Sequence, residues 1–298
     1  MKNDGRKIAR NAMPYIMIAP TCLLLVALML YPILRVFGYS TMQYNGAFNV
    51  EPQFIGAGNF IEIFTKDSFF GKVLWNSFRW VAWEVALQFL FGCVTALILN
   101  QSFRGRSAAR TVSLIPWAVS GVLTAILWQL IYNEHIGPLN DILLRLGVIS
   151  RKIAWLGDFN LVFPSVIVAE LWRGIPFFSI SLLAALQNIS PDLYEAARID
   201  GASYFKQLRY VILPFLKDTI LLTTLLRIVW EFNSVDVIFN LTGGGPGNRT
   251  MTLSMYITNQ AIKSGDYGYG SALSIISFLI LAVFAVLYLK AGGFANNE

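Results

Sequence analysis

Residues 195–214 read EAARIDGASYFKQLRYVILP, a charged, helix-forming segment with a glycine near its middle. The rest of the chain is mostly apolar: 56% of its 298 residues are hydrophobic, 13% are charged, and the mean hydropathy is +0.57. A soluble domain carries about 25% charged residues, so this composition indicates a membrane protein. A charged segment in such a chain is expected to lie outside the lipid.

Six apolar stretches lie on either side of this segment, and each is long enough to cross a hydrocarbon core of about 30 Å as a helix. The stretches are 14–39, 74–99, 109–132, 161–186, 214–241 and 271–289. We therefore predict an all-α membrane protein with six transmembrane helices. The first stretch is too long for a signal peptide and has no small-residue cleavage site close behind it, so we expect a retained span.

The placement of lysine and arginine predicts the orientation, because cytoplasmic loops carry an excess of both. With the N-terminus inside, the internal segments hold twelve of these residues and the external segments hold seven. We therefore expect both termini and the loop 190–213 in the cytoplasm. The chain then divides into 1–73, with the first helix and an extracytoplasmic loop, a transmembrane core 74–290, and a cytoplasmic tail 291–298. This bias accounts for the formal charge of +6 without a nucleic acid partner.

The loop itself predicts two short helices joined by a hinge. Ser190 can cap a helix that has Pro191 at its first position. Gly201 can adopt the left-handed conformation that ends this helix, and Ser203 can cap a second one. Pro214 then opens the fifth span. On these grounds alone, an amphipathic connector resting on the lipid surface is a second interpretation of the loop.

The sequence EAARIDGA followed by FKQLRYVILP resembles the EAA loop in the membrane subunits of binding-protein-dependent ABC importers. Leu208 and Val211 depart from the family pattern, which more often has an aromatic residue and an isoleucine there. In that family the loop is a coupling helix that docks into a cleft of the cytoplasmic ATPase. The resemblance implies this ATPase-coupling role for Glu195, Ala196, Ala197, Asp200, Gly201 and Ala202.

Three longer segments, 102–141, 167–202 and 239–258, resemble the carbohydrate-importing branch of that family, which contains the maltose-transporter membrane subunits and the glycerol-3-phosphate permeases. The resemblance implies the type I permease fold and a sugar or oligosaccharide as substrate, moved by alternating access across a bacterial or archaeal cytoplasmic membrane. It also implies a second, non-identical permease, two ABC ATPase subunits and an extracytoplasmic solute-binding protein as partners. ATP and Mg would bind to the ATPases, so we expect no cofactor on this chain.

Charged residues also fall inside the apolar spans, where insertion scales assign each a penalty of at least about 2.5 kcal/mol. They are Glu84, Glu170, Arg173, Arg227 and Glu231. All of them except Glu84 fall on two helix faces that also carry uncharged residues. In the fourth span the face consists of Glu170, Arg173, Gly174 and Phe177, and in the fifth it consists of Arg227, Trp230, Glu231 and Ser234. These faces form either ion pairs that fasten helices together or a polar translocation pathway for the substrate, and the two interpretations are compatible.

The pathway interpretation carries an expectation about the substrate. By resemblance, both faces coincide with positions that line the sugar site of the maltose-transporter subunit, where the residues are largely uncharged. A guanidinium group suits a carboxylate or phosphate, so we expect Arg173 and Arg227 to hold an acidic sugar such as a uronide, or a sugar phosphate. The same resemblance places Gly121 near the sugar path, although a helix kink at Pro116 also explains that region.

Motifs for chemistry are missing from the sequence. The stretch LTGGGPGNRT, residues 241–250, is not a phosphate-binding loop, because Asn248 stands where that motif requires lysine, and we expect tight external turns instead. His135 is the only histidine, so neither a histidine-rich metal site nor a histidine-based catalytic triad is expected. A transport subunit is thus the main prediction. The alternatives are a secondary transporter or channel that relays ions along the buried charges, and, more weakly, a membrane enzyme.

Overall fold

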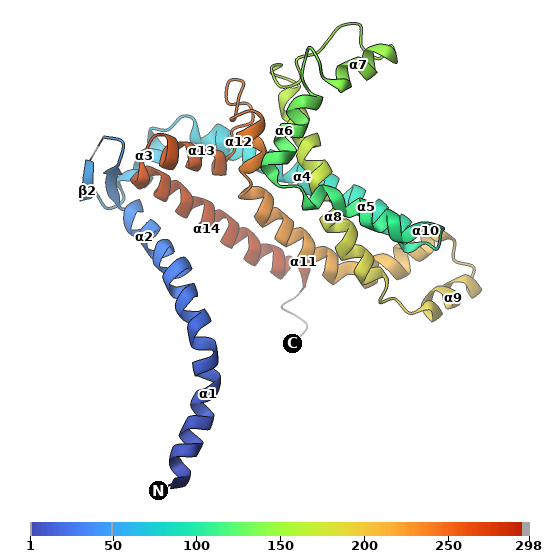
Figure 1. Ribbon diagram of the computed structural model, residues 1–298, viewed down its shortest axis with the longest axis horizontal. Coiled ribbons are helices and arrows are strands. Elements are labelled where there is room, and N and C mark those ends of the chain that lie inside the picture. The colour runs from blue at the N-terminus through green and yellow to red at the C-terminus, as the bar shows by residue number, and fades with distance from the viewer. Residues whose placement is uncertain (1, 49, 294–298) are drawn as a thin grey trace. The chain divides into compact units, whose positions relative to one another are not determined.

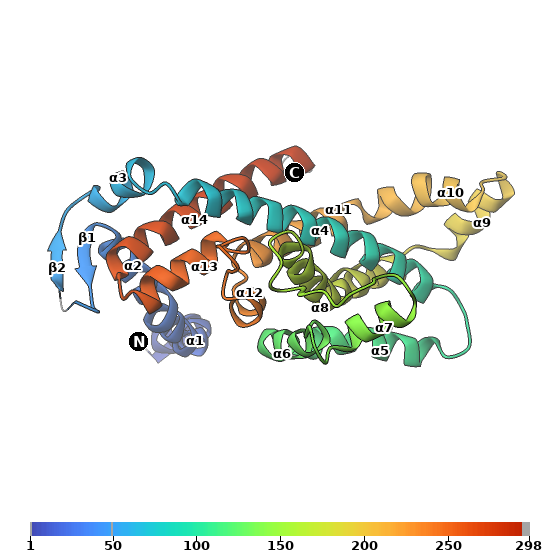
Figure 2. The same cartoon turned by 90° about the horizontal axis from the view of Figure 1, so that it is seen from above.

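The computed structural model describes residues 2–48 and 50–293. The tail expected at 291–298 lies outside the described residues from 294 onward. The chain divides into two compact units: Met1–Asp67 with Ile257–Leu279, and Ser68–Tyr256 with Ile280–Glu298. Most of the described chain is helical, and its strands form one hairpin (Figures 1 and 2).

A long apolar helix opens the first unit. It is built from α1 (Lys2–Leu25), a π-helical turn η1 (Val26–Leu30) and α2 (Tyr31–Ser40) (Figure 1, blue). The segment Met13–Ser40 is long and apolar enough to cross a membrane, as predicted for the first span, and 0% of its most apolar window is buried. An apolar helix without a buried face needs lipid or another protein around it.

A hairpin and a short helix follow in the first unit. Strands β1 (Met42–Asn45) and β2 (Val50–Phe54) pair antiparallel, and α3 (Gly58–Thr65) comes next. The buried Asn59 donates hydrogen bonds from Nδ2 to the carbonyl oxygens of Ser40 and Met42, each over 2.9 Å. These bonds fasten α3 to the end of α2 and the start of the hairpin.

Three long helices form the core of the second unit: α4 (Phe70–Asn100), α8 (Val162–Leu186) and α11 (Leu213–Phe232). Trp80 of α4 and Phe178 of α8 are among its largest fully buried side chains. At Gly92 of α4, an added Cβ would overlap the side chain of Phe178, so α4 and α8 approach closely because residue 92 has no side chain.

The remaining elements are shorter, except for α14. In the second unit they are α5 (Arg106–Ala118), α6 (Gly121–Ile131), α7 (Pro138–Arg145), α9 (Pro191–Ile199), α10 (Tyr204–Gln207), the π-helical turn η2 (Leu208–Ile212) and α12 (Asp236–Leu241). Three further elements are α13 (Leu253–Thr258), the π-helical turn η3 (Asn259–Lys263) and α14 (Tyr267–Gly292). The glycines at 243, 244 and 247 all have positive φ, which agrees with the tight turns expected after the fifth span.

The predicted spans need two corrections. The third, 109–132, is broken between α5 and α6 by a bend of 96°, and Ser120 caps α6 by accepting a hydrogen bond from the Leu123 amide. The fifth, 214–241, ends as a helix at Phe232, before α12 begins. Among the described residues, four helices are long and apolar enough to cross a membrane, or five if α5 and α6 form one span. The count of six stays a prediction, since α11 carries too many charged residues to be counted on composition.

Candidate functional site

The two helix faces predicted from spacing meet in the second unit through ion pairs. Arg173 donates two hydrogen bonds to Glu170, from Nε to Oε2 over 3.0 Å and from Nη2 to Oε1 over 2.6 Å. Arg227 Nη2 lies 2.6 Å from Glu231 Oε1 and 3.3 Å from Glu170 Oε1. Arg227 therefore joins α8 to α11.

Gln88 of α4 lies at the centre of these charges. Its Nε2 donates to Glu84 Oε2 over 2.8 Å and to Glu231 Oε1 over 3.0 Å, and its Oε1 accepts from Arg227 Nε over 2.5 Å. We name the residues Glu84, Gln88, Glu170, Arg227 and Glu231 the buried cluster, since each is at most 4% exposed. Sequence reasoning noted Glu84 only as an intramembrane charge and missed Gln88. The available signal was two polar residues one helical turn apart in an apolar span.

Gly174 makes room for this arrangement. An added Cβ at this position would overlap both the amide of Gln88 and the guanidinium group of Arg227. The close approach of the two side chains to α8 therefore requires glycine. Gly174 was predicted on the pathway, and the structure places it against the buried cluster.

Three other predicted residues remain accessible beside the buried cluster, and we name Arg173, Phe177 and Trp230 the accessible face. The Arg173 side chain is 23% exposed and Trp230 is 47% exposed. The Phe177 and Trp230 rings pack with their centroids 5.0 Å apart. Helical spacing alone could not separate this face from the buried cluster.

Gly121 lies apart from the buried cluster, at the break between α5 and α6. A Cβ added there would come within 2.6 Å of Asp236 Cβ, so the first turn of α12 lies directly against the start of α6. Asp236 is exposed, and its charge acts on Arg173. Sequence reasoning did not single out Asp236. Ser234 is half-buried in the segment between α11 and α12, and no hydrogen bond among the described residues joins its side chain to the buried cluster.

The charged segment has the helix start that its sequence predicts. Helix α9 begins at Pro191, the Ser190 hydroxyl accepts a hydrogen bond from the Asp192 amide over 3.3 Å, and Gly201 has a φ of +71°. Burial raises the pKa of the Tyr194 hydroxyl above its usual value, so this side chain stays neutral. The cap, the proline and the left-handed glycine are thus confirmed.

The expected coupling residues differ in exposure. Glu195, Ala196, Asp200 and Gly201 are exposed, Ala202 is half-buried and Ala197 is buried. The Ala202 amide donates to the Ala197 carbonyl over 2.8 Å, and the Ala202 carbonyl accepts from Gln207 Nε2 over 2.9 Å. These bonds tie the end of α9 to α10.

The second short helix requires a correction, because it is not separate from the fifth span. Helix α10, the turn η2 and α11 follow one another without a break from Tyr204 to Phe232 (Figure 2). Pro214 lies at the start of α11 but inside this continuous helix. The π-helical turn before it relaxes the hydrogen-bond pattern where proline lacks an amide proton.

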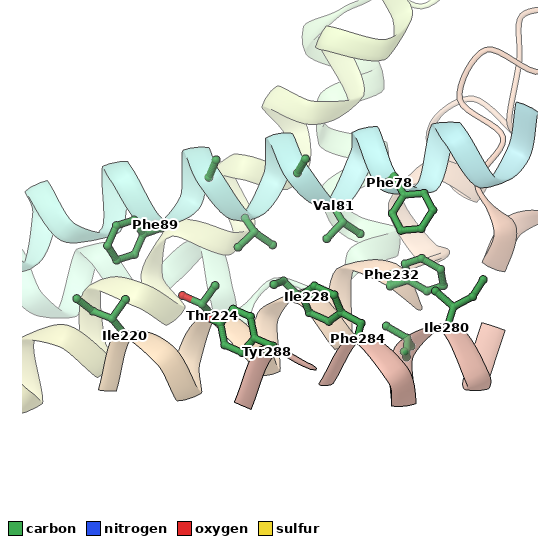
Figure 3. A pocket seen from close by; sticks show the side chains of 14 residues that line it. Phe78, Val81, Phe89, Ile220, Thr224, Ile228, Phe232, Ile280, Phe284 and Tyr288 are labelled. Carbon is green, nitrogen blue, oxygen red and sulfur yellow. The ribbon is translucent and has the colours of Figure 1, made fainter. Parts of the chain in front are cut away.

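A separate cavity of about 520 Å³ lies between α4, α11 and the C-terminal half of α14. Figure 3 shows that aromatic and aliphatic side chains line it, including Phe78, Phe89 and Phe284. Its lining contains no charged side chain, and its hydroxyl groups are those of Thr224 and Tyr288. A polar solute needs more hydrogen-bond partners than this, so we do not assign the cavity to the pathway. Within the described residues, no group of three or more metal-binding side chains is placed to hold an ion.

Comparison with known proteins identifies the chain. Residues 88–291, more than half of its length, match the family described as "Binding-protein-dependent transport system inner membrane component". The chain belongs to this family. The match confirms the resemblance read from residues 195–214.

Similar proteins support the assignment along nearly the whole chain. The trehalose/maltose transport system permease protein MalF of Thermococcus litoralis is 37% identical, over 95% of this chain and 94% of its own. The sulfoquinovosyl glycerol transport system permease protein SmoG of Agrobacterium fabrum is 30% identical, over 92% and 88%. A solved structure of a bacterial alginate ABC transporter, in complex with its pentasaccharide-bound periplasmic protein, has a subunit with the same fold: the TM-score is 0.85, the identity 22%, and 98% of each chain is covered.

The chain is therefore an inner-membrane permease subunit of a binding-protein-dependent ABC importer. It is an all-α, multi-pass protein with the type I importer fold. Permease subunits of this kind are transport components, so the chain is not an enzyme.

Proposed function

We propose that this permease translocates a sugar or oligosaccharide by alternating access. The accessible face carries the proposal, because Phe177 and Trp230 offer paired aromatic rings and Arg173 precedes Phe177 by one turn of α8. Solute sites are typically lined by aromatic side chains with a few placed polar groups. The Thermococcus and Agrobacterium relatives, named for trehalose/maltose and sulfoquinovosyl glycerol, point to the same class of substrate.

The ion pairs that Arg227 and Arg173 already form indicate the charge of the sugar. Arg227, expected above to hold an acidic group, has a 5% exposed side chain and already contacts two carboxylates. Arg173 is more accessible but forms two hydrogen bonds with Glu170. The charge of Arg173 is therefore already matched by a carboxylate, so the geometry favours an uncharged sugar over a uronide or sugar phosphate.

The remaining predicted pathway residues have supporting roles in this proposal. Glu170, Gly174, Arg227 and Glu231 shape and hold the wall behind the accessible face. Gly121 and Ser234 lie at the two helix breaks of the pathway. A helix break leaves backbone groups without helical partners, so these can bind sugar hydroxyl groups.

Residues 195–202 couple the permease to a partner ATPase in this proposal. Glu195, Ala196, Asp200 and Gly201 present an exposed surface for docking, while Ala197 and Ala202 brace it from within. Closure of two ATPase subunits around ATP and Mg would move α9, and the continuous helix from 204 to 232 would carry that movement to Arg227 and Glu231. A second, non-identical permease completes the pathway, and an extracytoplasmic binding protein delivers the sugar. Both termini lie in the cytoplasm.

The test is gentle extraction of the tagged chain from its native membrane, with mass spectrometry of the proteins that stay bound. We expect two further proteins, an ABC ATPase and a second permease. The binding protein encoded beside them is then screened against neutral and acidic oligosaccharides, and a preference for neutral ones is expected. A chain that transports solute without an ATPase, driven by membrane potential or a pH gradient, would replace this proposal with the ion-relay alternative.

A further inference from the structure

The buried cluster and Arg173 contain unequal numbers of acidic and basic groups. The carboxyl groups belong to Glu84, Glu170 and Glu231, whereas the guanidinium groups are those of Arg173 and Arg227. Glu170 contacts both arginines and Glu231 contacts Arg227. Among the ion pairs of the described residues, none includes Glu84. One carboxyl group is therefore left without a cation.

Glu84 is enclosed by the protein. It is 0% exposed, its Oε2 accepts one hydrogen bond from Gln88, and its Oε1 has no hydrogen-bond partner. An ionised carboxylate with neither a cation nor a full set of donors is strongly unfavourable in such a place, so the group takes up a proton instead.

The surrounding charged groups support the same assignment. Glu170 and Arg173 face the buried cluster from α8, and Arg227 and Glu231 face it from α11. Arg79, the arginine of α4, is engaged elsewhere, with its Cζ 3.8 Å from the centre of the Phe163 ring and a hydrogen bond to Asn76. It forms no ion pair with Glu84 within the described chain.

Glu231 is the other carboxyl group to consider, because its Oε2 also lacks a hydrogen-bond partner. Its Oε1, however, lies 2.6 Å from Arg227 Nη2 and 3.0 Å from Gln88 Nε2. The carboxyl group of Glu231 thus has a cation and an amide donor on one oxygen, whereas that of Glu84 has no cation. The two guanidinium groups are then matched by the carboxylates of Glu170 and Glu231.

We propose that Glu84 holds a proton inside the protein and acts as a positioning residue for α11. Neutral Glu84 accepts one N–H of Gln88, which directs the other N–H to Glu231 and the carbonyl oxygen to Arg227. Both N–H donors and the carbonyl oxygen of the Gln88 amide group are thus engaged. Through these hydrogen bonds, α4 fixes the positions of Arg227 and Glu231 on α11, and thereby the contact of Arg227 with Glu170 on α8.

The test compares Glu84→Gln with the matched variants Glu170→Gln and Glu231→Gln in the full-length chain, purified into lipid nanodiscs with the subunits that stay bound. Glutamine has the shape of a protonated glutamic acid, so E84Q should keep thermal stability and uptake within about twofold of the wild type. E170Q and E231Q each leave an arginine short of a carboxylate, and uptake should fall by about tenfold or more. Glu84→Ala should also lose uptake, because Gln88 is left unheld.

Infrared spectroscopy reads the proton directly. The wild type at neutral pH should show the C=O stretching band of a protonated carboxyl group, and E84Q should lack it while E170Q and E231Q retain it. The proposal is overturned if the wild type has no such band, if the band persists in E84Q, or if E231Q removes it. Wild-type uptake in E84A would refute the positioning role. The infrared reading needs no substrate and no ATPase, so it stands independently of the proposed function.

Discussion

Arg173 and Arg227 carry the same charge but have different surroundings. Arg227 is enclosed by Glu170, Glu231 and Gln88, whereas Arg173 keeps part of its surface accessible. Removing one member of such a buried network leaves its partners unpaired. At the scale of the residue, we propose that Arg173 serves substrate binding and Arg227 holds the helices together.

The accessible face gives a prediction for a single side chain. Replacing Trp230 by alanine should raise the KM for the transported sugar about fivefold or more, because ring stacking contributes roughly 1 kcal/mol beyond the apolar area buried. ATP-dependent uptake in proteoliposomes over a range of sugar concentrations measures it. Trp83→Ala is the matched control, since Trp83 is another half-exposed tryptophan, at 54%, on α4. Equal KM values in the two variants would contradict the sugar-binding role.

At the scale of the element, the helix from 204 to 232 links the charged segment that contains α9 to the middle of the second unit. Gly201 is the flexible point before it, with a φ of +71° and no atom within 4 Å of an added Cβ. Alanine there would be strained by about 1–2 kcal/mol for backbone reasons alone. The strain would fall on the joint between α9 and α10.

Gly201→Ala should therefore lower sugar uptake per ATP hydrolysed by about fivefold or more while ATP hydrolysis continues. Gly147→Ala is a close control, because Gly147 has a φ of +70° and equally open surroundings in the loop after α7. Both variants should lose similar stability, which thermal unfolding measures. If G147A impairs coupling as strongly as G201A, general destabilisation is the cause and the coupling role is wrong.

Helix ends with local signals were predictable from the sequence, but breaks inside apolar spans were not. Ser190, Pro191 and Gly201 impose their own backbone geometry, so the start and the end of α9 followed from residue types. A kink at Pro116 was one interpretation of the third span, but residue types did not predict a 96° bend with a new helix start at Gly121.

In the candidate site, too, some features were predictable from the sequence and others were not. Helical spacing predicted which charges share a face, and the structure shows them paired. The contribution of Gln88 depends on how α4 is rotated against α8 and α11, and that rotation is a property of tertiary packing. Spacing along single helices therefore could not identify Gln88 as the residue at the centre of the buried cluster.

At the scale of the whole molecule, the distribution of basic residues predicts the sidedness of the protein. In a chain with Cys22 and Cys93 replaced by serine, a single cysteine at Ser203 should react with a membrane-impermeant thiol reagent only in inside-out vesicles. A cysteine at Ser150 should react only in spheroplasts, because the excess of lysine and arginine keeps the loop 190–213 in the cytoplasm. The reverse pattern would contradict the orientation. Both serines are exposed or half-exposed, so failure to react in either preparation is not expected.

The pairing of charges in the second unit has an electrical consequence. Moving one elementary charge across a membrane potential of about 100 mV exchanges about 2.3 kcal/mol with the field. Two guanidinium groups matched by two carboxylates, with Glu84 neutral, have no net charge to move. The membrane potential then does no work on this cluster as the permease changes conformation. The free energy of moving the cluster should therefore be the same in a polarised and in a depolarised cell.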